Sequence, residues 1–141
     1  MSAWRRAALE CVPELRQKIE KAETLTYVWI ELWLAFVEAY EEPKRDDLIA
    51  EIYHFAKWCL ASKDLEVRSA VWIGFFEHLG SYAIEKGSRS LEVVKDMARH
   101  ISVRQFGSVR VALGYFITAK QLEDLADRHR KEIPKWQKLS K

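Results

Sequence analysis

Apolar residues recur at helical spacing along most of the chain. Between residues 25 and 40 they follow one another at alternating intervals of three and one, which places them on one face of a helix. Ile30 and Leu34 widen this apolar face, so we expect the helix to be covered on more than one side. Pro43 ends the helical pattern, because proline disfavours helical geometry in the residue before it.

The same spacing predicts further helices over residues 3–10, 13–22, 46–61, 65–84, 90–101 and 119–132. The last of these is expected to stop before Pro134. A connector of a few residues makes 46–61 and 65–84 an antiparallel hairpin. The second helix of this hairpin is apolar almost all round, which is typical of a central helix. Gly74 within it would allow a neighbouring helix to approach closely.

Residues 104–118 fit two interpretations. Val109, Val111 and Leu113 alternate with other residues as in a strand, but a lone strand in a helical protein has nothing to pair with, so we favour a helix. The expected fold is all-α, a single compact domain of six or seven helices over residues 1–132, followed by a basic C-terminal tail over 133–141. Its antiparallel helical hairpins would be stacked in a loosely HEAT-like manner.

Composition supports a folded helical domain. The chain has 141 residues, of which 49% are apolar and 31% charged, with five Gly and three Pro. This apolar content argues against disorder, and so few Gly and Pro argue against a turn-rich β fold. Cys11 and Cys59 form no Cys-x-x-Cys pair, so neither a disulfide framework nor a structural zinc site is expected. A signal peptide and a long uncharged apolar stretch are both missing from the sequence, which indicates a soluble cytoplasmic protein.

A net charge of +2 hides an uneven distribution. Residues 31–51 contain seven acidic and two basic side chains, whereas the basic excess lies in the last 14 residues. The acidic segment predicts a surface that steers a basic protein partner. The candidate partner-binding residues are Glu38, Glu41, Glu42, Asp46, Asp47 and Glu51.

His78 offers a second candidate site. In the predicted hairpin, position 78 comes level with about position 47, so His78 could meet Asp47 or Glu51 in an aromatic pocket. A histidine–carboxylate pair can act as a general base, but no nucleophile or oxyanion donor is patterned beside it. The alternatives to a protein-binding module are therefore a ligand-binding protein or enzyme using this pair, and a nucleic-acid binder using the basic C-terminus. The spacings match no metal site or phosphate-binding loop, so we expect no cofactor and no metal.

The segment 51–79 resembles a family of small, uncharacterised bacterial helical proteins. The matching positions are Asp64, Glu66, Val67, Phe75, Phe76, Glu77 and Leu79. This resemblance implies a helical, HEAT-like fold and a bacterial cytoplasmic setting. Proteins of this kind are suspected immunity or partner-binding proteins, which implies no catalytic residues. The leading hypothesis is thus a non-enzymatic protein–protein interaction module, and its specific form is an immunity-type inhibitor that docks a basic partner.

Overall fold

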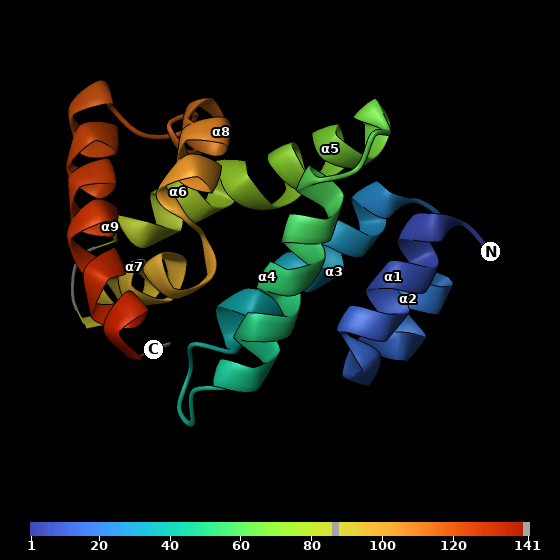
Figure 1. The fold of residues 1–141 in the computed structure, drawn as a ribbon. Helices are drawn as coiled ribbons and strands as arrows, with labels where there is room; N and C mark the ends of the chain where they lie inside the picture. Colours follow the sequence, from blue (N-terminus) through green and yellow to red (C-terminus); the bar gives the residue numbers. More distant parts are fainter. Residues whose placement is uncertain (86–87, 140–141) are drawn as a thin grey trace. The chain divides into compact units, whose positions relative to one another are not determined.

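The computed structural model describes residues 1–85 and 88–139, and it places them in helices and turns without a strand. The expected all-α class is confirmed. The chain divides into two compact units, Met1–Phe75 and Phe76–Lys141, and we describe each unit by itself (Figure 1). Of the stretch 104–118, the part up to Leu113 is helical, which confirms the favoured interpretation there, whereas residues 114–118 lie in a turn and connector. The number of six or seven helices is not confirmed, because the described residues contain elements α1 to α9.

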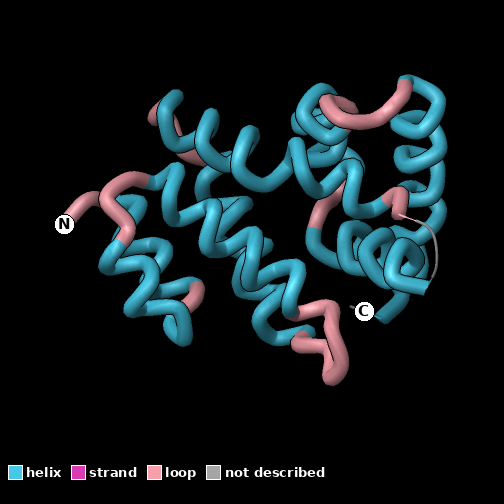
Figure 2. The backbone as a smooth tube through the Cα atoms, turned by 180° about the vertical axis from the view of Figure 1, so that it is seen from behind, coloured by secondary structure: helices cyan, strands magenta, loops and turns pink. Residues whose placement is uncertain are grey.

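The first unit follows the helices predicted over residues 3–61. It contains α1 (Ala3–Cys11), a 3-10 turn (Pro13–Leu15), α2 (Arg16–Lys21), α3 (Leu25–Glu38), α4 (Asp46–Leu60) and α5 (Leu65–Val71). The single helix predicted over 65–84 consists instead of α5, a π-helical turn (Trp72–Phe76) and α6 (Glu77–Ala83). The backbone from Leu65 to Ala83 stays helical, as the tube in Figure 2 shows. The boundary between the two units falls inside the π-helical turn.

The core of the first unit is aromatic, and Phe75 lies at its centre. The Phe75 ring lies 5.1 Å from Phe36, 5.4 Å from Trp29 and 5.5 Å from Tyr53, measured between ring centroids. All four side chains are buried, so the hydrophobic effect and ring packing act together here. Gly74 makes this arrangement possible, since a Cβ atom at that position would lie 2.5 Å from Trp29 Cβ. The predicted close approach at Gly74 is therefore confirmed.

Arg5 ties α1 to the C-terminal end of α2. Its guanidinium donates hydrogen bonds to the carbonyl oxygens of Ile19 at 2.6 Å and Ala22 at 2.8 Å, and a longer one to Glu20 at 3.3 Å. The last carbonyls of a helix have no partner within the helix, and a cation also suits the negative end of the helix dipole. A helix as short as α2 is not stable alone, so this contact helps to fix it.

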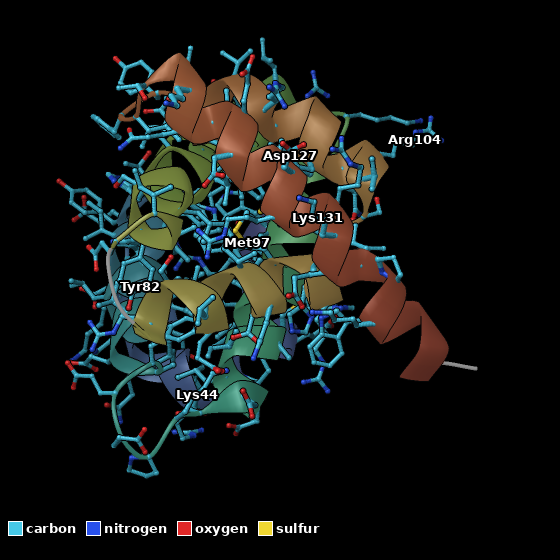
Figure 3. All side chains as sticks on the ribbon, turned by 90° about the vertical axis from the view of Figure 1, so that its left-hand side faces the viewer. Lys44, Tyr82, Met97, Arg104, Asp127 and Lys131 are labelled. Atoms are coloured by element: carbon cyan, nitrogen blue, oxygen red, sulfur yellow. The ribbon has the colours of Figure 1, made fainter. Side chains whose placement is uncertain are left out.

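The second unit consists of α6, α7 (Ser88–His100), α8 (Val103–Leu113) and α9 (Ala119–Leu139). The helices predicted over 90–101 and 119–132 are thus confirmed. In Figure 3 Met97 lies on the inner side of α7, and it is fully buried. α6 and α8 pack backbone to backbone, because a Cβ atom on Gly80 would lie 1.8 Å from the carbonyl oxygen of Leu113. Only glycine fits at such a crossing.

The expected helix end before Pro134 is wrong. α9 continues through Pro134 to Leu139, so residues 133–139 of the predicted basic tail are helical, whereas residues 140 and 141 lie outside the described residues. Proline removes a backbone hydrogen bond from a helix interior, and packing beyond it must offset this loss. Such a contact exists, since the Arg99 guanidinium stacks 5.1 Å from the Trp136 ring.

Candidate functional site

The outward face of α3 carries three exposed apolar side chains. Tyr27, Ile30 and Leu34 are 56%, 50% and 56% exposed. Their intervals of three and four residues place them on one side of the helix. The expectation that Ile30 and Leu34 are covered is therefore wrong, because α3 uses only the adjacent row around Trp29 and Phe36 to reach the core. Exposed apolar side chains gathered in this way mark interaction sites in many proteins.

Acidic residues continue this row at the C-terminal end of α3. Glu38 follows Leu34 by four residues at the end of α3, so helical geometry places it on the same side. Glu41 lies in the turn that follows, where its amide donates to the Glu38 carbonyl oxygen at 3.0 Å. Glu38, Glu41 and Glu42 are all exposed. Within the part of the chain that the structure describes, none of the three forms an ion pair. Their negative charge is therefore available to a partner.

A groove adjoins this face between α2 and α3. It has a volume of about 390 Å³, and its lining includes Lys18, Lys21, Tyr27 and Glu31. Lys18 and Glu31 form an ion pair across it at 3.7 Å. Tyr27 belongs both to this groove and to the exposed apolar row, so the two features form one continuous surface.

Asp46 and Asp47, which sequence reasoning placed on the acidic surface, have basic partners. Lys44 lies 3.1 Å from Asp46, and the Arg45 guanidinium lies 2.9 Å from Asp47 and 2.6 Å from Glu14. The hydrogen bond from Arg45 is the largest cause of the lowered pKa of Asp47, and those to Asp47 and Glu14 raise the pKa of Arg45. This network joins the 3-10 turn to the start of α4, and it gives Asp46 and Asp47 each a basic neighbour, with Arg45 shared between Asp47 and Glu14.

Glu51 differs from the other predicted acids because it is half-buried. Its Oε2 atom is shielded from solvent and has no hydrogen-bond partner among the described residues. Burial raises the pKa of Glu51, and the nearby carboxylates of Glu14 and Asp47 raise it further, although Arg45 opposes them. Burial also raises the pKa of the Cys11 thiol, with smaller contributions from Glu10 and Glu51, so Cys11 stays protonated.

His78 lies in α6, in the second unit, where its ring stacks on Phe116 with 5.7 Å between centroids. Asp47 and Glu51 belong to the first unit, so the predicted pairing of His78 with either carboxylate stays a prediction. The described residues contain no group of three or more His, Cys, Asp or Glu side chains placed to hold a metal ion.

Sequence reasoning missed His129. This side chain of α9 is 1% exposed, its Nε2 atom lies 2.8 Å from the carbonyl oxygen of Ile101, and its ring stacks on Phe106 at 4.7 Å. Burial lowers the pKa of His129, although hydrogen bonds to the backbone of Ile101 and Met97 oppose the shift. The ring is therefore neutral at neutral pH and donates through Nε2 to the Ile101 carbonyl oxygen. The signal was its position four residues after Leu125, on the buried row of α9.

Cys59 is buried, and burial raises its pKa to about 12. The Trp29 side chain acts weakly in the opposite direction, although the Trp29 Nε1 atom lacks a hydrogen bond of good geometry. At neutral pH Cys59 is therefore a packed thiol and not a nucleophile.

Comparisons with known proteins identify a family whose function is unknown. None of the described helices is both long enough and apolar enough to cross a bilayer. No curated protein and no solved structure matches the chain. The family described as Domain of unknown function (DUF7674) matches residues 6–100, which run from α1 to the end of α7 and include the segment 51–79. Since this match covers well over half of the sequence, the chain belongs to the DUF7674 family.

Proposed function

We propose that this protein is a non-enzymatic interaction module that binds a basic, partly apolar segment of another protein. The proposed docking face consists of Tyr27, Ile30, Leu34, Glu38, Glu41 and Glu42. One observation carries the proposal: a row of exposed apolar side chains on α3 leads directly into exposed carboxylates that form no ion pair in the described part of the chain. Apolar side chains supply the area to bury, and the carboxylates favour a partner rich in Lys and Arg.

The proposed face is narrower than the acidic surface predicted from the sequence. Asp46 and Asp47 contribute little to it, because Lys44 and Arg45 already pair with them. Glu51 is half-buried and has a raised pKa, so it does not add a full exposed charge. The remaining acids lie next to the apolar row, which suits a partner helix with one apolar and one basic face.

We extend the proposal to an immunity-type inhibitor, in which the docking face covers the working surface of a basic partner. The resemblance over residues 51–79 is what supports this form of the proposal, and the docking face lies inside the same DUF7674 match. A loosely HEAT-like stacking of the hairpins belongs to the same proposal. Neither role requires a catalytic residue.

The apolar row is tested by capture of a partner from the native lysate. Wild-type protein is compared with a variant that combines Ile30→Ser and Leu34→Ser. Both side chains are exposed, so the fold should tolerate the change, whereas a docked partner should lose roughly tenfold or more in affinity. Leu65→Ser is the matched control, since Leu65 is 66% exposed in the same unit but lies outside the face.

The charges are tested separately with the captured partner once it is purified. Glu38→Gln with Glu41→Gln should slow association and flatten its dependence on salt, because exposed charges act mainly on the association rate. Glu10→Gln with Glu66→Gln removes equal charge from exposed positions elsewhere in the unit and serves as the control. Equal capture by wild type and the Ile30/Leu34 variant, or equal rates for the two charge variants, would contradict the proposed docking face.

A further inference from the structure

The second unit contains a cavity that the proposed function does not use. It has a volume of about 740 Å³, within the range of small-molecule sites, and it opens to solvent. It lies where the C-terminal end of α7, the start of α8 and the last turns of α9 meet. The residues that matter for its chemistry are Arg99, His100, Ser102, Arg104, Ile133 and Trp136.

The charged side chains among the described lining residues are all basic. Arg99 and Arg104 both line the cavity, and no Asp or Glu does. Arg104 is exposed and projects outward from the start of α8 in Figure 3. The nearest acid in sequence to the α9 wall, Glu132, already pairs with Lys135 at 3.0 Å. Such a lining attracts an anion.

Backbone donors of α8 add to this attraction. Ser102 caps the helix and forms a reciprocal capping box with Gln105, at 3.1 Å and 2.9 Å. The amides of Val103 and Arg104 lie in the first turn of α8, where backbone N–H groups have no acceptor within the helix. Both residues line the cavity. A helix of 11 residues also presents the positive end of its dipole here.

An aromatic wall with an unused donor completes the cavity. The Arg99 guanidinium stacks 5.1 Å from the Trp136 ring, which orients the arginine beside an apolar surface that includes Ile133. The Trp136 Nε1 atom is shielded from solvent and has no hydrogen-bond partner among the described residues. A shielded donor of this kind is costly unless an acceptor satisfies it.

We propose that this cavity, the anion pocket, binds a small organic phosphate. Two guanidinium groups and two helix amides offer more donors than the two oxygens of a carboxylate can accept, whereas a phosphate group has enough oxygens for all of them. The apolar part of the ligand packs against Ile133 and Trp136. The pocket is independent of the docking face, which lies in the first unit, and only residues 98–100 of its lining fall within the DUF7674 match.

Trp136 provides a selective probe for this pocket. The other five tryptophans belong to the first unit, so Trp136 is the single tryptophan of the second. Its indole N–H resonance, assigned with Trp136→Phe, is followed in the intact protein while phenyl phosphate, inorganic phosphate, benzoate or phenol is added. We expect phenyl phosphate to shift this resonance at the lowest concentration, and phenol to leave it unchanged.

Variants then separate binding in the pocket from general attraction. Arg99→Gln and Arg104→Gln should each weaken phenyl phosphate binding by about tenfold or more, because each removes a charge-assisted hydrogen bond. Arg89→Gln, an exposed position on α7 outside the pocket, should leave it unchanged. Amide spectra verify that each variant is folded, and the exposed Arg104 provides the safer variant if Arg99→Gln is not. An indole resonance that no anion shifts, benzoate binding as tight as phenyl phosphate, or equal loss in Arg89→Gln and Arg104→Gln would overturn the proposal.

Discussion

Gly80→Ala is expected to disrupt the crossing of α6 and α8 in the second unit. The added Cβ atom would lie 1.8 Å from the Leu113 carbonyl oxygen, whereas contacts of real Cβ atoms below 3.0 Å are essentially never seen. The two helices must therefore separate by more than 1 Å. The obstacle is backbone, so no side-chain rotation can relieve it.

The expected loss of stability follows from two opposing effects. Overpacking a well-filled interior costs about 1–3 kcal/mol, and a backbone obstacle belongs at the upper end of that range. Alanine recovers about 1 kcal/mol of helix propensity, which leaves a net loss of about 2 kcal/mol. Gly107→Ala is the matched control, because a Cβ atom there meets no atom within 4 Å. It should stabilise the protein by about 0.5–1 kcal/mol.

Urea unfolding followed by circular dichroism compares the two variants with wild type. Amide hydrogen exchange in α6 and α8 then locates the change within the second unit. Gly80→Ala should lower the unfolding midpoint and Gly107→Ala should raise it. If Gly80→Ala is as stable as wild type and keeps wild-type exchange in α8, the close backbone packing of α6 on α8 is refuted.

Two further predictions concern polar contacts that hold single helices in place. Arg5→Leu should destabilise the first unit by about 2–3 kcal/mol, because it leaves the Ile19 and Ala22 carbonyls without their charged donor. Arg6 is its exposed neighbour, and Arg6→Leu should change the unfolding free energy by less than about 0.5 kcal/mol. For His129 the folded pKa is lowered by burial, so the unfolded chain binds more protons below about pH 6.5 and stability falls as the pH decreases through that range. His129→Gln should flatten this fall in urea midpoints measured between about pH 5 and 7, and an unchanged pH dependence would show that the ring is not held neutral.

Helix positions could be predicted from the sequence because helical periodicity is local. The signals that predict α3 and the connector before α5 each lie within a short stretch of sequence. The end of α9 could not, because Pro134 signals a stop while the Arg99–Trp136 contact that outweighs it joins residues far apart in sequence. Helix propensity is a weak signal when tertiary packing opposes it.

The sequence predicts the negative charge of the candidate site, but not which of its residues are paired or buried. A run of acids around residues 31–51 is visible in the sequence, yet it does not reveal that Arg45 bridges Asp47 and Glu14, a residue 31 positions away. Nor does apolar spacing reveal which of two adjacent rows on α3 meets the core, so it predicts covered positions at Ile30 and Leu34, which the structure leaves exposed. Both errors have one cause: pairing and burial depend on neighbours that sequence order does not supply.

The charge of the two units gives the two proposals a common basis. Residues 1–75 carry 13 acidic and 10 basic side chains, whereas residues 76–141 carry 8 acidic and 13 basic ones. A net charge near zero for the whole chain thus conceals one unit suited to a basic partner and one suited to an anion. The docking face lies inside the DUF7674 match, and most of the anion pocket lies beyond it, in α8 and α9. Loss of partner capture with an intact indole response would therefore contradict the docking face alone. The reverse result would contradict the anion pocket alone.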